Sequence, residues 1–454
     1  MRMKTHLDPA RKIPVCDEVD VLVCGGGPAG FCAAIAAARG GAKVLLLEQT
    51  NCLGGIAGAG GHNHLCLYTA WSSGERVVAG VPFEMMDRVV KMGYGAWDHE
   101  PKKAHGGSVD FELEGLKLAL EQMAAEAGVK LLYHTLFADA IVEGGRCVGA
   151  AIQNKTGRQA VLARQVIDAT GDADVAASAC APFELGRPGD GACQPATLMF
   201  TIGGVDWKRV CEFRKGDYRL QHVWEAAQKA GDMEPFQNQI MGWWWTPTRP
   251  DQVGVNFTHI FGTDCTNAES ITRATIEGRR QAFHMIPVLR KYIPGMEDCC
   301  LLSTAALLGT RESRRIVGEH VLNEREIVAC KSWDDSICYG SFFIDIHNCT
   351  GPGMDEESWR PEKGFKYQIP YRSIVPKKVD NLLVAGRCIS VTHVALGSTR
   401  VMPQCGALGE AAGAAAALSL QARCTPRELD VRKLQEHLRS AGAICDEQSL
   451  KAAN

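Results

Sequence analysis

The sequence has no long apolar run and no excess of charge of either sign. No stretch approaches the roughly 18 uninterrupted apolar residues of a membrane-spanning helix, and residues 1–9 contain no apolar core of the kind found in a secretory signal. The formal net charge of -3 provides no field that would attract a phosphate backbone or anionic lipid. We therefore expect a cytoplasmic protein that acts on a small-molecule substrate and binds neither nucleic acid nor membrane.

The cysteines lack the spacings of the common redox centres. There are 19 of them, an odd number, and several lie in apolar segments, as Cys24 and Cys405 do, which favours reduced thiols. The sequence contains no CxxC, no CxxCH and no ferredoxin-like run, which argues against a thioredoxin-like disulfide, a c-type haem and an iron–sulfur cluster. We expect no metal site, so any redox cofactor should be organic.

Length and glycine are what the sequence has in abundance. A chain of 454 residues exceeds the roughly 250 to 300 residues at which a single core stops growing, so two domains are expected. The 48 glycines make up a larger fraction of the residues than the ~7% that is usual in proteins.

A βαβ unit with a glycine-rich turn is predicted near the N-terminus. Its elements are an apolar strand at 19–24, an alanine-rich helix at 28–39 and a second strand at 43–48. Gly25, Gly27 and Gly30 follow the first strand with GxGxxG spacing, which suits a tight turn, a close approach to a pyrophosphate and close helix packing. Glu48 ends the second strand, where a carboxylate can accept hydrogen bonds from a ribose. This arrangement favours FAD or NAD over NADP.

The remaining pattern predicts that the chain leaves this sheet and returns to it. A helix is expected over 110–128, closed by Gly128, and four strands then form a β-meander that returns to a further strand at Val166. The four strands are predicted at 129–133, 140–143, 147–153 and 159–162. Later elements are predicted as a helix at 268–288, a strand at 381–386 and a glycine- and alanine-rich helix at 406–420.

Three further motifs resemble the FAD-dependent oxidoreductase family. They are Leu53-Gly54-Gly55, the segment from Asp168 to Asp172, and Leu383-Val-Ala-Gly386-Arg387, and the run from Gly309 to Gly318 is similar to a signature of uncharacterised members. The resemblance is to the branch with the glutathione-reductase-type fold that includes fumarate reductase flavoproteins and thiazole-synthesis enzymes. It implies an α/β fold with a Rossmann-like FAD-binding domain at 1–181 and 371–454 and an inserted α+β substrate domain at 182–370.

The resemblance also implies which residues hold FAD. The loop at Gly54-Gly55 would pass the pyrophosphate and flavin, and Gly386 would approach the ribityl chain. The expected cofactor-binding residues are Gly25, Gly26, Gly27, Pro28, Ala29, Gly30, Glu48, Gln49, Gly54, Gly55, Ile56, Ala138, Thr170, Gly171, Asp172, Gly386, Arg387, Met402 and Gly406.

A helix that begins near Met402 to Gly406 independently suits a flavin. The positive end of a helix stabilises negative charge on the reduced ring, although a core helix would give the same pattern. No second strand–GxGxxG–helix unit is present, because the glycines at 58–61 lack a preceding strand. We therefore expect electrons to come from the substrate, from free NAD(P)H or from a redox partner protein, and a homodimer is compatible with the sequence.

Four residues are candidates for catalysis. Arg400 lies ahead of the flavin-facing helix, where the fumarate reductase branch has a carboxylate-binding arginine; a buried ion pair or a phosphate contact is the alternative. His62 and His64 follow the loop at Gly54-Gly55, and His393 lies between Gly386 and Arg400, so each could exchange a proton or simply form a local hydrogen bond.

Three other patterns have two interpretations each. Arg311 and Arg315 are four apart and would share a helical face with Glu319, either as a solvated salt-bridged face or as an anchor for an anionic substrate. The tryptophans at 243–245 could line a pocket or pack a core. Cys405 could be redox-active or a small buried apolar residue.

These features favour an FAD-dependent dehydrogenase or reductase that transfers a hydride between flavin N5 and a small carboxylate, alcohol or sugar-like metabolite. Two other functions stay open: an electron-transfer subunit that relays electrons to a partner protein, and a biosynthetic enzyme resembling the thiazole-forming members.

Overall fold

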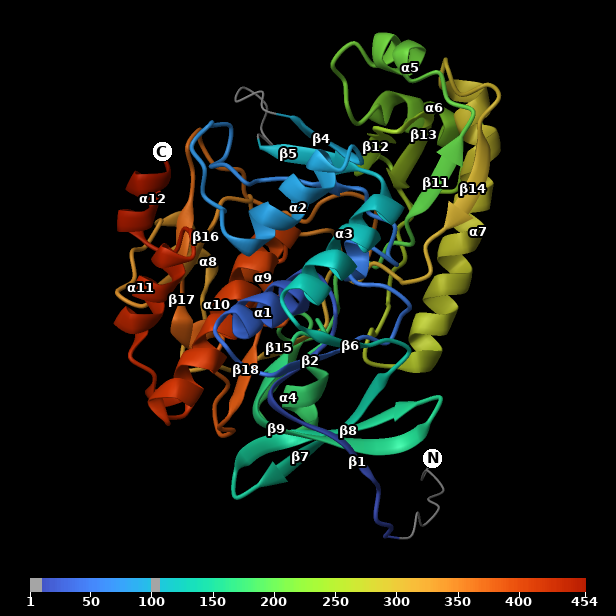
Figure 1. Cartoon of the computed structure of the whole chain (residues 1–454). Helices are drawn as coiled ribbons and strands as arrows, with labels where there is room; N and C mark the ends of the chain where they lie inside the picture. The colour runs from blue at the N-terminus through green and yellow to red at the C-terminus, as the bar shows by residue number, and fades with distance from the viewer. Residues whose placement is uncertain (1–9, 99–106) are drawn as a thin grey trace.

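A sheet built around parallel strands forms the centre of the computed structural model, which describes residues 10–98 and 107–454 (Figure 1). Its strands are β1 (Val15–Cys24), β2 (Val44–Leu47), β6 (Lys130–Leu132), β7 (Leu136–Glu143), β8 (Arg146–Asn154), β9 (Gly157–Asp168) and β18 (Leu382–Val384). The order is β6-β2-β1-β9-β8-β7, and β18 pairs with the end of β9. Strands β1, β2, β6, β9 and β18 run parallel, whereas β7, β8 and β9 form an antiparallel meander.

This sheet confirms the predicted α/β class and the βαβ unit, and it confirms the β-meander over β7, β8 and β9. Two details differ: β6, expected as the first strand of the meander, pairs in parallel with β2 instead, and the strands expected at 159–162 and from Val166 are a single strand, β9. On one edge of β9, residues 157–162 pair with β8 and residues 166–168 pair with β18. On the opposite edge, β1 pairs with residues 160–168, so no turn interrupts β9.

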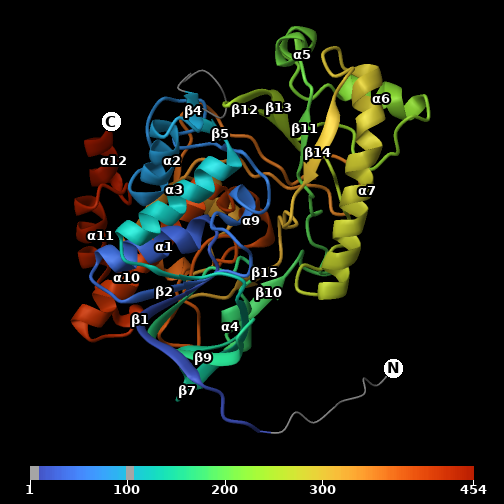
Figure 2. The same cartoon turned by 45° about the vertical axis from the view of Figure 1, so that its right-hand side comes forward.

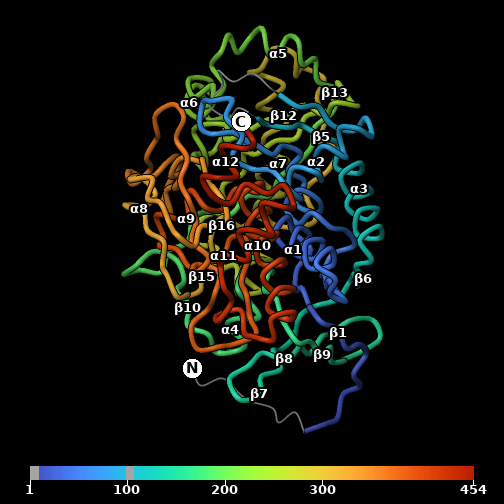
Figure 3. Tube along the Cα trace, turned by 60° about the vertical axis from the view of Figure 1, so that its left-hand side comes forward, coloured from blue at the N-terminus to red at the C-terminus, as the bar shows by residue number. Residues whose placement is uncertain are grey.

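Helices α1 (Pro28–Arg39) and α10 (Met402–Ala422) lie side by side against the sheet although they come from opposite ends of the chain (Figures 1 and 3). Glycine makes this approach possible: a Cβ atom on Gly409 would lie 2.0 Å from the Ala29 carbonyl oxygen, and one on Gly413 would lie 2.1 Å from that of Ala33. Helix α1 has the predicted bounds, and α10 begins at Met402, the first residue of the segment where a helix start is predicted, with Pro403 in its first turn.

A second sheet lies apart from the first (Figure 2). Its antiparallel strands are β11 (Phe200–Gly203), β12 (Gly242–Thr246), β13 (Arg249–Asn256) and β14 (Cys300–Thr304), in the order β12-β13-β11-β14. Helices α5 (Trp207–Arg214), α6 (Gln221–Lys229) and α7 (Ala268–Tyr292) complete a separate apolar core that contains Trp224, Trp243 and Phe257. The helix predicted at 268–288 is therefore confirmed, and it continues to Tyr292.

Smaller elements connect these layers. A three-stranded sheet consists of β3 (His64–Leu65), β5 (Ser108–Phe111) and β4 (Gly95–Asp98), and β5 leads into α3 (Leu113–Glu126). The predicted helix at 110–128 thus begins three residues late, because Asp110 and Phe111 pair with β3 and β4. The remaining strands and longer helices are β10 (Phe183–Leu185), β15 (Arg314–Ile316), β16 (Ser336–Gly340), β17 (Tyr367–Pro370), α2 (Val81–Lys91), α4 (Asp174–Ser178), α8 (Glu324–Val328), α9 (His393–Thr399), α11 (Val431–Ser440) and α12 (Glu447–Ala453).

The prediction that Arg311, Arg315 and Glu319 share a helical face is wrong. This segment is extended, and Arg315 lies in β15, which pairs with β10. Strand pairing and a buried ion pair between Arg315 and Glu312 hold the segment in that conformation. The two arginines consequently have different surroundings.

In the part of the chain that the structure describes, no helix is long and apolar enough to cross a membrane. Residues 1–9, where the sequence predicts no secretory signal, lie outside the described residues.

Candidate functional site

The residues predicted to bind a dinucleotide meet at one edge of the parallel sheet. Gly25 follows β1, Glu48 follows β2, Asp168 ends β9, and Gly386 follows β18 by one residue. The carboxyl ends of parallel strands face the same side, which is where α/β folds bind their ligands. The sequence motifs are therefore gathered in one place by the topology.

The turn between β1 and α1 has the shape of a phosphate cradle. Gly25 has a φ of +102°, and a Cβ on Gly30 would lie 1.8 Å from the Gly25 carbonyl oxygen, so both positions require glycine. A Cβ on Gly27, in contrast, would meet only the Cα of Gly55, 4.0 Å away. No side chain caps the N-terminus of α1. Open space in front of an uncapped helix N-terminus fits the pyrophosphate of FAD.

Glu48 is fixed beside this turn. Its two carboxylate oxygens accept hydrogen bonds from the backbone N–H groups of Gly26 at 2.8 Å and Thr50 at 2.7 Å. The side chain is buried. These contacts hold the carboxylate in place, and its remaining lone pairs are available to the hydroxyl groups of a ribose.

The segments after β9 and β18 are tied together by an ion pair. Arg387 donates to the Asp172 carboxylate at 2.7 Å and to the Ser313 hydroxyl at 2.7 Å. Asp168 is fully buried and accepts hydrogen bonds from Thr170 and Ala176, and burial raises its pKa to about 6. This network fixes the loops that carry Thr170, Gly171 and Gly386.

The other predicted cofactor residues have varied surroundings. Gly54 caps the 3₁₀ turn Gly55–Ala57, which contains Ile56, and Met402 begins α10. Gln49 is exposed, and Ala138 lies half-buried in β7. Gly406 lies in the second turn of α10, where a Cβ would meet Pro82 and Cys32.

A cavity of about 870 Å³ lies next to this edge of the sheet. It is lined from one side by Ile56 and by Arg400 to Pro403 at the start of α10, and from the other by the β12 tryptophans. Six arginines and three aspartates line it: Arg214, Arg219, Arg311, Arg360, Arg387, Arg400, Asp98, Asp110 and Asp345. A cavity of this size with apolar walls and a few charged groups is typical of a small-molecule site.

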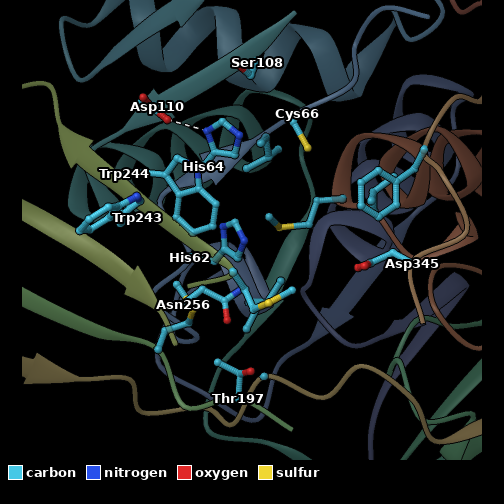
Figure 4. A pocket seen from close by; sticks show the side chains of 18 of the residues that line it. His62, His64, Cys66, Ser108, Asp110, Thr197, Trp243, Trp244, Asn256 and Asp345 are labelled. Atoms are coloured by element: carbon cyan, nitrogen blue, oxygen red, sulfur yellow. Dashed lines mark hydrogen bonds and ion pairs between the residues drawn. The ribbon is translucent and has the colours of Figure 1, made fainter. Parts of the chain in front are cut away.

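His62 and His64 lie together in this cavity with their ring centroids 6.5 Å apart, and both rings stack against Trp244 (Figure 4). The Trp244 ring lies 4.6 Å from the His62 ring and 4.9 Å from the His64 ring, measured between centroids. Trp244 therefore lines the pocket, whereas Trp243 also contributes to the core of the second sheet.

The two histidines have opposite protonation states. Burial, and then the charge of His64, lower the pKa of His62 to about 3, and its Nδ1 has no hydrogen-bond partner among the described residues. Burial also disfavours charge on His64, but hydrogen bonds with Asp110 and Cys66 outweigh it and raise the pKa to about 9. The His64 Nδ1 lies 2.6 Å from the Asp110 carboxylate. At neutral pH the site thus holds a neutral imidazole beside an imidazolium.

Arginines form the opposite wall. Arg400 donates to the Asp345 carboxylate at 3.0 Å and to its backbone oxygen at 2.9 Å, and its Nε has no partner within the described part of the chain. Burial lowers the pKa of Arg400. The guanidinium predicted to bind a substrate carboxylate thus faces the cavity but already carries an aspartate as its partner.

Of the six arginines that line the cavity, Arg311 is the most buried. It donates to the Pro195 carbonyl oxygen at 2.7 Å and to the Thr197 hydroxyl at 2.6 Å. None of the carboxylates in the described residues forms an ion pair with it. Burial, and then the charge of Arg400, lower its pKa to about 9, so that Arg311 is still protonated at neutral pH.

His393 and Cys405 are placed away from this cavity. His393 is buried, and its Nδ1 lies 2.7 Å from Glu312, which also binds Arg315 at 2.6 Å. The Cys405 thiol is buried and contacts the Thr399 carbonyl oxygen. Neither residue is among the described residues that line the cavity.

Sequence reasoning missed Asp110, Cys66 and Asp345. The signal for Cys66 was present, because residues 62, 64 and 66 alternate and so project on one side of an extended chain. Asp110 and Asp345 gave no local signal, since each meets its partner through pairing of distant segments.

Several known proteins are similar to this chain. The family described as "FAD dependent oxidoreductase" matches residues 20–438. A thiamine thiazole synthase of Aeropyrum pernix is 34% identical over 137 residues, which cover 29% of this chain and 43% of that protein. A fumarate reductase (cytochrome) of Shewanella frigidimarina is 41% identical over 81 residues, 17% of this chain and 13% of that protein. The chain thus spans less than two thirds of the length of these relatives.

Among solved structures, a geranylgeranyl bacteriochlorophyll reductase-like protein of Thermoplasma acidophilum is similar over 96% of this chain and 90% of that one. The two share 15% sequence identity, and the TM-score is 0.49.

Proposed function

The chain belongs to the family of FAD-dependent oxidoreductases, and from this premise we propose that it transfers a hydride between FAD and a small organic acid. The family match spans most of the chain, which confirms the resemblance drawn from the glycine motifs and identifies FAD as the cofactor. The nature of the substrate is our inference from the cavity.

Arg311 is the observation that supports an acidic substrate. A buried guanidinium is costly unless an anion or several acceptors compensate it. Arg311 has two short hydrogen bonds to neutral oxygens and no carboxylate partner among the described residues. A substrate carboxylate bound there would supply the missing charge, and guanidinium geometry suits it.

FAD itself would be held by the glycine turn at 25–30, by Glu48 and by the loops at Gly54 and Gly386. When bound, it supplies a two-electron acceptor or donor for the hydride. The N-terminus of α10 has no side-chain cap and lines the cavity through Met402 and Pro403, so its dipole is available to stabilise negative charge there.

Proton transfer is the task we assign to His64. Its imidazolium can donate a proton to a substrate oxygen, and the Asp110 carboxylate orients the ring and stabilises its charge. The neutral ring of His62, which also stacks against Trp244 and lies 6.5 Å from the His64 ring, can accept a hydrogen bond from the same substrate. Two neighbouring groups whose pKa values are pushed apart are typical of an acid and base pair.

The test is anaerobic mixing of the FAD-loaded protein with separate panels of carboxylic acids, neutral alcohols and sugars. We expect the visible flavin bands to bleach with a member of the first panel, or the reduced flavin to be reoxidised by one. Turnover with neutral sugars alone would contradict the assignment of an acid.

The cavity of about 870 Å³ next to the predicted FAD-binding edge also favours an enzyme over a pure electron relay, because a relay needs no room for a small-molecule substrate. Reduction of the flavin by a partner protein, without any effect of small acids, would reinstate that alternative.

A further inference from the structure

Cys66 lies beside the His64–Asp110 pair, and the backbone explains why. His64 and Asp110 are directly opposite each other in the antiparallel pairing of β3 with β5. Cys66 follows His64 by two residues, so both side chains project on the same side of the extended chain. Figure 4 shows His64 between Asp110 on one side and Cys66 on the other, with His64 and Cys66 lining the same cavity.

The three side chains are connected in series. The Asp110 carboxylate lies 2.6 Å from His64 Nδ1, and a side-chain hydrogen bond with Cys66 also contributes to the raised pKa of the same imidazole. Trp244 stacks on the His64 ring with an angle of 10° between the planes, which fixes the ring's orientation. A nucleophile in hydrogen-bond contact with a base that a third group orients is the arrangement of covalent catalysis.

Cys66 also has the surroundings that a reactive thiol needs. It is a cysteine thiol of intermediate exposure that lines the cavity, so small molecules can reach it. An imidazolium neighbour stabilises a thiolate, which is the nucleophilic form. In the described residues no group of His, Cys, Asp and Glu side chains is arranged to hold a metal ion. We therefore interpret Cys66, His64 and Asp110 as a hydrogen-bonded series and not as a metal site.

We propose that Cys66, His64 and Asp110 form a nucleophilic triad that binds the carbonyl carbon of an aldehyde substrate covalently. Cys66 is the nucleophile, His64 the acid and base, and Asp110 the positioning residue. The inference rests on the proposed function in one respect, namely that the cavity holds the substrate; the reactive thiolate itself requires no flavin.

The step is a reversible addition that is balanced without an oxidant. The thiolate sulfur forms a bond to the carbonyl carbon while the π bond of the carbonyl breaks. The carbonyl oxygen takes the proton from the second ring nitrogen of His64, which leaves a hemithioacetal and a neutral imidazole. The former carbonyl carbon is then tethered in the cavity with its hydrogen still attached.

Alkylation with iodoacetamide, followed by mass spectrometry of each cysteine peptide, tests the thiolate. The exposed Cys180, Cys211 and Cys300 of the same protein serve as reference thiols. An ordinary thiol of pKa ~8.5 is ionised to only roughly 0.3% at pH 6. A thiolate held by the His64 imidazolium persists at that pH, so Cys66 should react faster than the references at pH 6.

At pH 9 the order should reverse, because a thiol of ordinary pKa ~8.5 is largely ionised there and is intrinsically more nucleophilic than a thiolate stabilised by a cation. This reversal separates a low thiol pKa from a simple difference in accessibility. The reversal should disappear in His64→Gln and shift toward higher pH in Asp110→Asn. The matched control is His222→Gln, at an exposed pair of His222 with Asp217, which should leave the profile of Cys66 unchanged. A Cys66 profile that parallels the reference thiols, or a reversal that survives His64→Gln, would overturn the triad.

Protection by glyoxylate tests the covalent step. Glyoxylate carries an aldehyde and a carboxylate, and glycolate has a similar size and charge without the carbonyl group. We expect glyoxylate, but not glycolate, to slow alkylation of Cys66 reversibly, and the Cys66→Ser protein to lose the difference in affinity between the two acids. Equal protection by both acids would contradict covalent binding while leaving the proposed acid site intact. If acids still bleach the flavin in Cys66→Ser, the proposed function holds whether or not Cys66 binds the carbonyl group. The two claims can therefore fail separately.

Discussion

Replacing Arg311 by methionine separates binding from stability. The guanidinium is buried against the cavity and donates two short hydrogen bonds, to Pro195 and Thr197, but no carboxylate of the described residues pairs with it. A substrate carboxylate would form charge-assisted hydrogen bonds with it, each contributing about 1.5 to 3 kcal/mol. Loss of the guanidinium should therefore cost about 2 to 4 kcal/mol of binding free energy, or roughly 30- to 1,000-fold in Kd.

The free energy of unfolding should change little in Arg311→Met. The variant loses hydrogen bonds to the Pro195, Thr197 and Asn256 oxygens, which costs about 1 kcal/mol each, but it also removes a buried charge that no carboxylate of the described residues pairs with directly. The two effects oppose each other. We therefore expect the melting temperature of the FAD-loaded protein to stay within a few degrees of the parent, in contrast to the large loss of affinity.

The assay is titration of the FAD-loaded protein with benzoate and with fumarate, monitored by the perturbation of the flavin spectrum. Arg360→Met is the matched control: Arg360 also lines the cavity, but it is exposed and lies over the Phe343 ring at 5.0 Å. It should weaken binding by less than about tenfold, in a salt-dependent manner. Equal losses in both variants, or an unchanged Kd in Arg311→Met, would refute the reasoning.

Three further predictions follow from the geometry. Gly27→Ala should lower FAD affinity with little effect on the apoprotein's melting temperature, because the added Cβ enters open space, whereas Gly30→Ala should destabilise the fold itself since its Cβ would lie 1.8 Å from the Gly25 carbonyl oxygen; calorimetry and FAD titration distinguish the two. Burial raises the pKa of Glu410 to about 8, so the stability it contributes is present below pH ~4.5 and is lost as the pH rises through about 8. Glu410→Gln should therefore raise the melting temperature at pH 9 and not at pH 4, and equal effects at both values would count against it. Substrate turnover should fall above pH ~9 as His64 loses its proton, and this alkaline limb should be absent in His64→Gln if pH–rate profiles are compared.

The dinucleotide edge could be predicted from sequence because its signals are local. Apolar strand runs, a glycine turn and the start of a helix follow one another within residues 19–48, and their chemistry depends on near neighbours. Parallel pairing of β1 with β2 and β9 then brings the distant motifs at Asp168 and Gly386 to the same edge. The pairing of the strands therefore places all the predicted dinucleotide-binding motifs at one edge of the sheet.

The substrate cavity could not be predicted in this way, because its walls come from segments that tertiary packing brings together. The four-residue spacing of Arg311 and Arg315 fits a helix equally well, and only pairing of β15 with β10 decides for an extended segment. His393 has the composition of an acid or base, yet Glu312, 81 residues away, holds it in a buried network. Asp110 becomes the partner of His64 only through the register of two short strands.

FAD binding by the purified protein tests the account's central claim most directly. The apoprotein should take up one equivalent of FAD, show the two visible absorption bands of oxidised flavin, and gain thermal stability as the FAD concentration rises. Gly27→Ala should shift that titration to higher FAD concentrations. A folded protein that takes up no FAD and shows no change in melting temperature with added FAD would contradict the account.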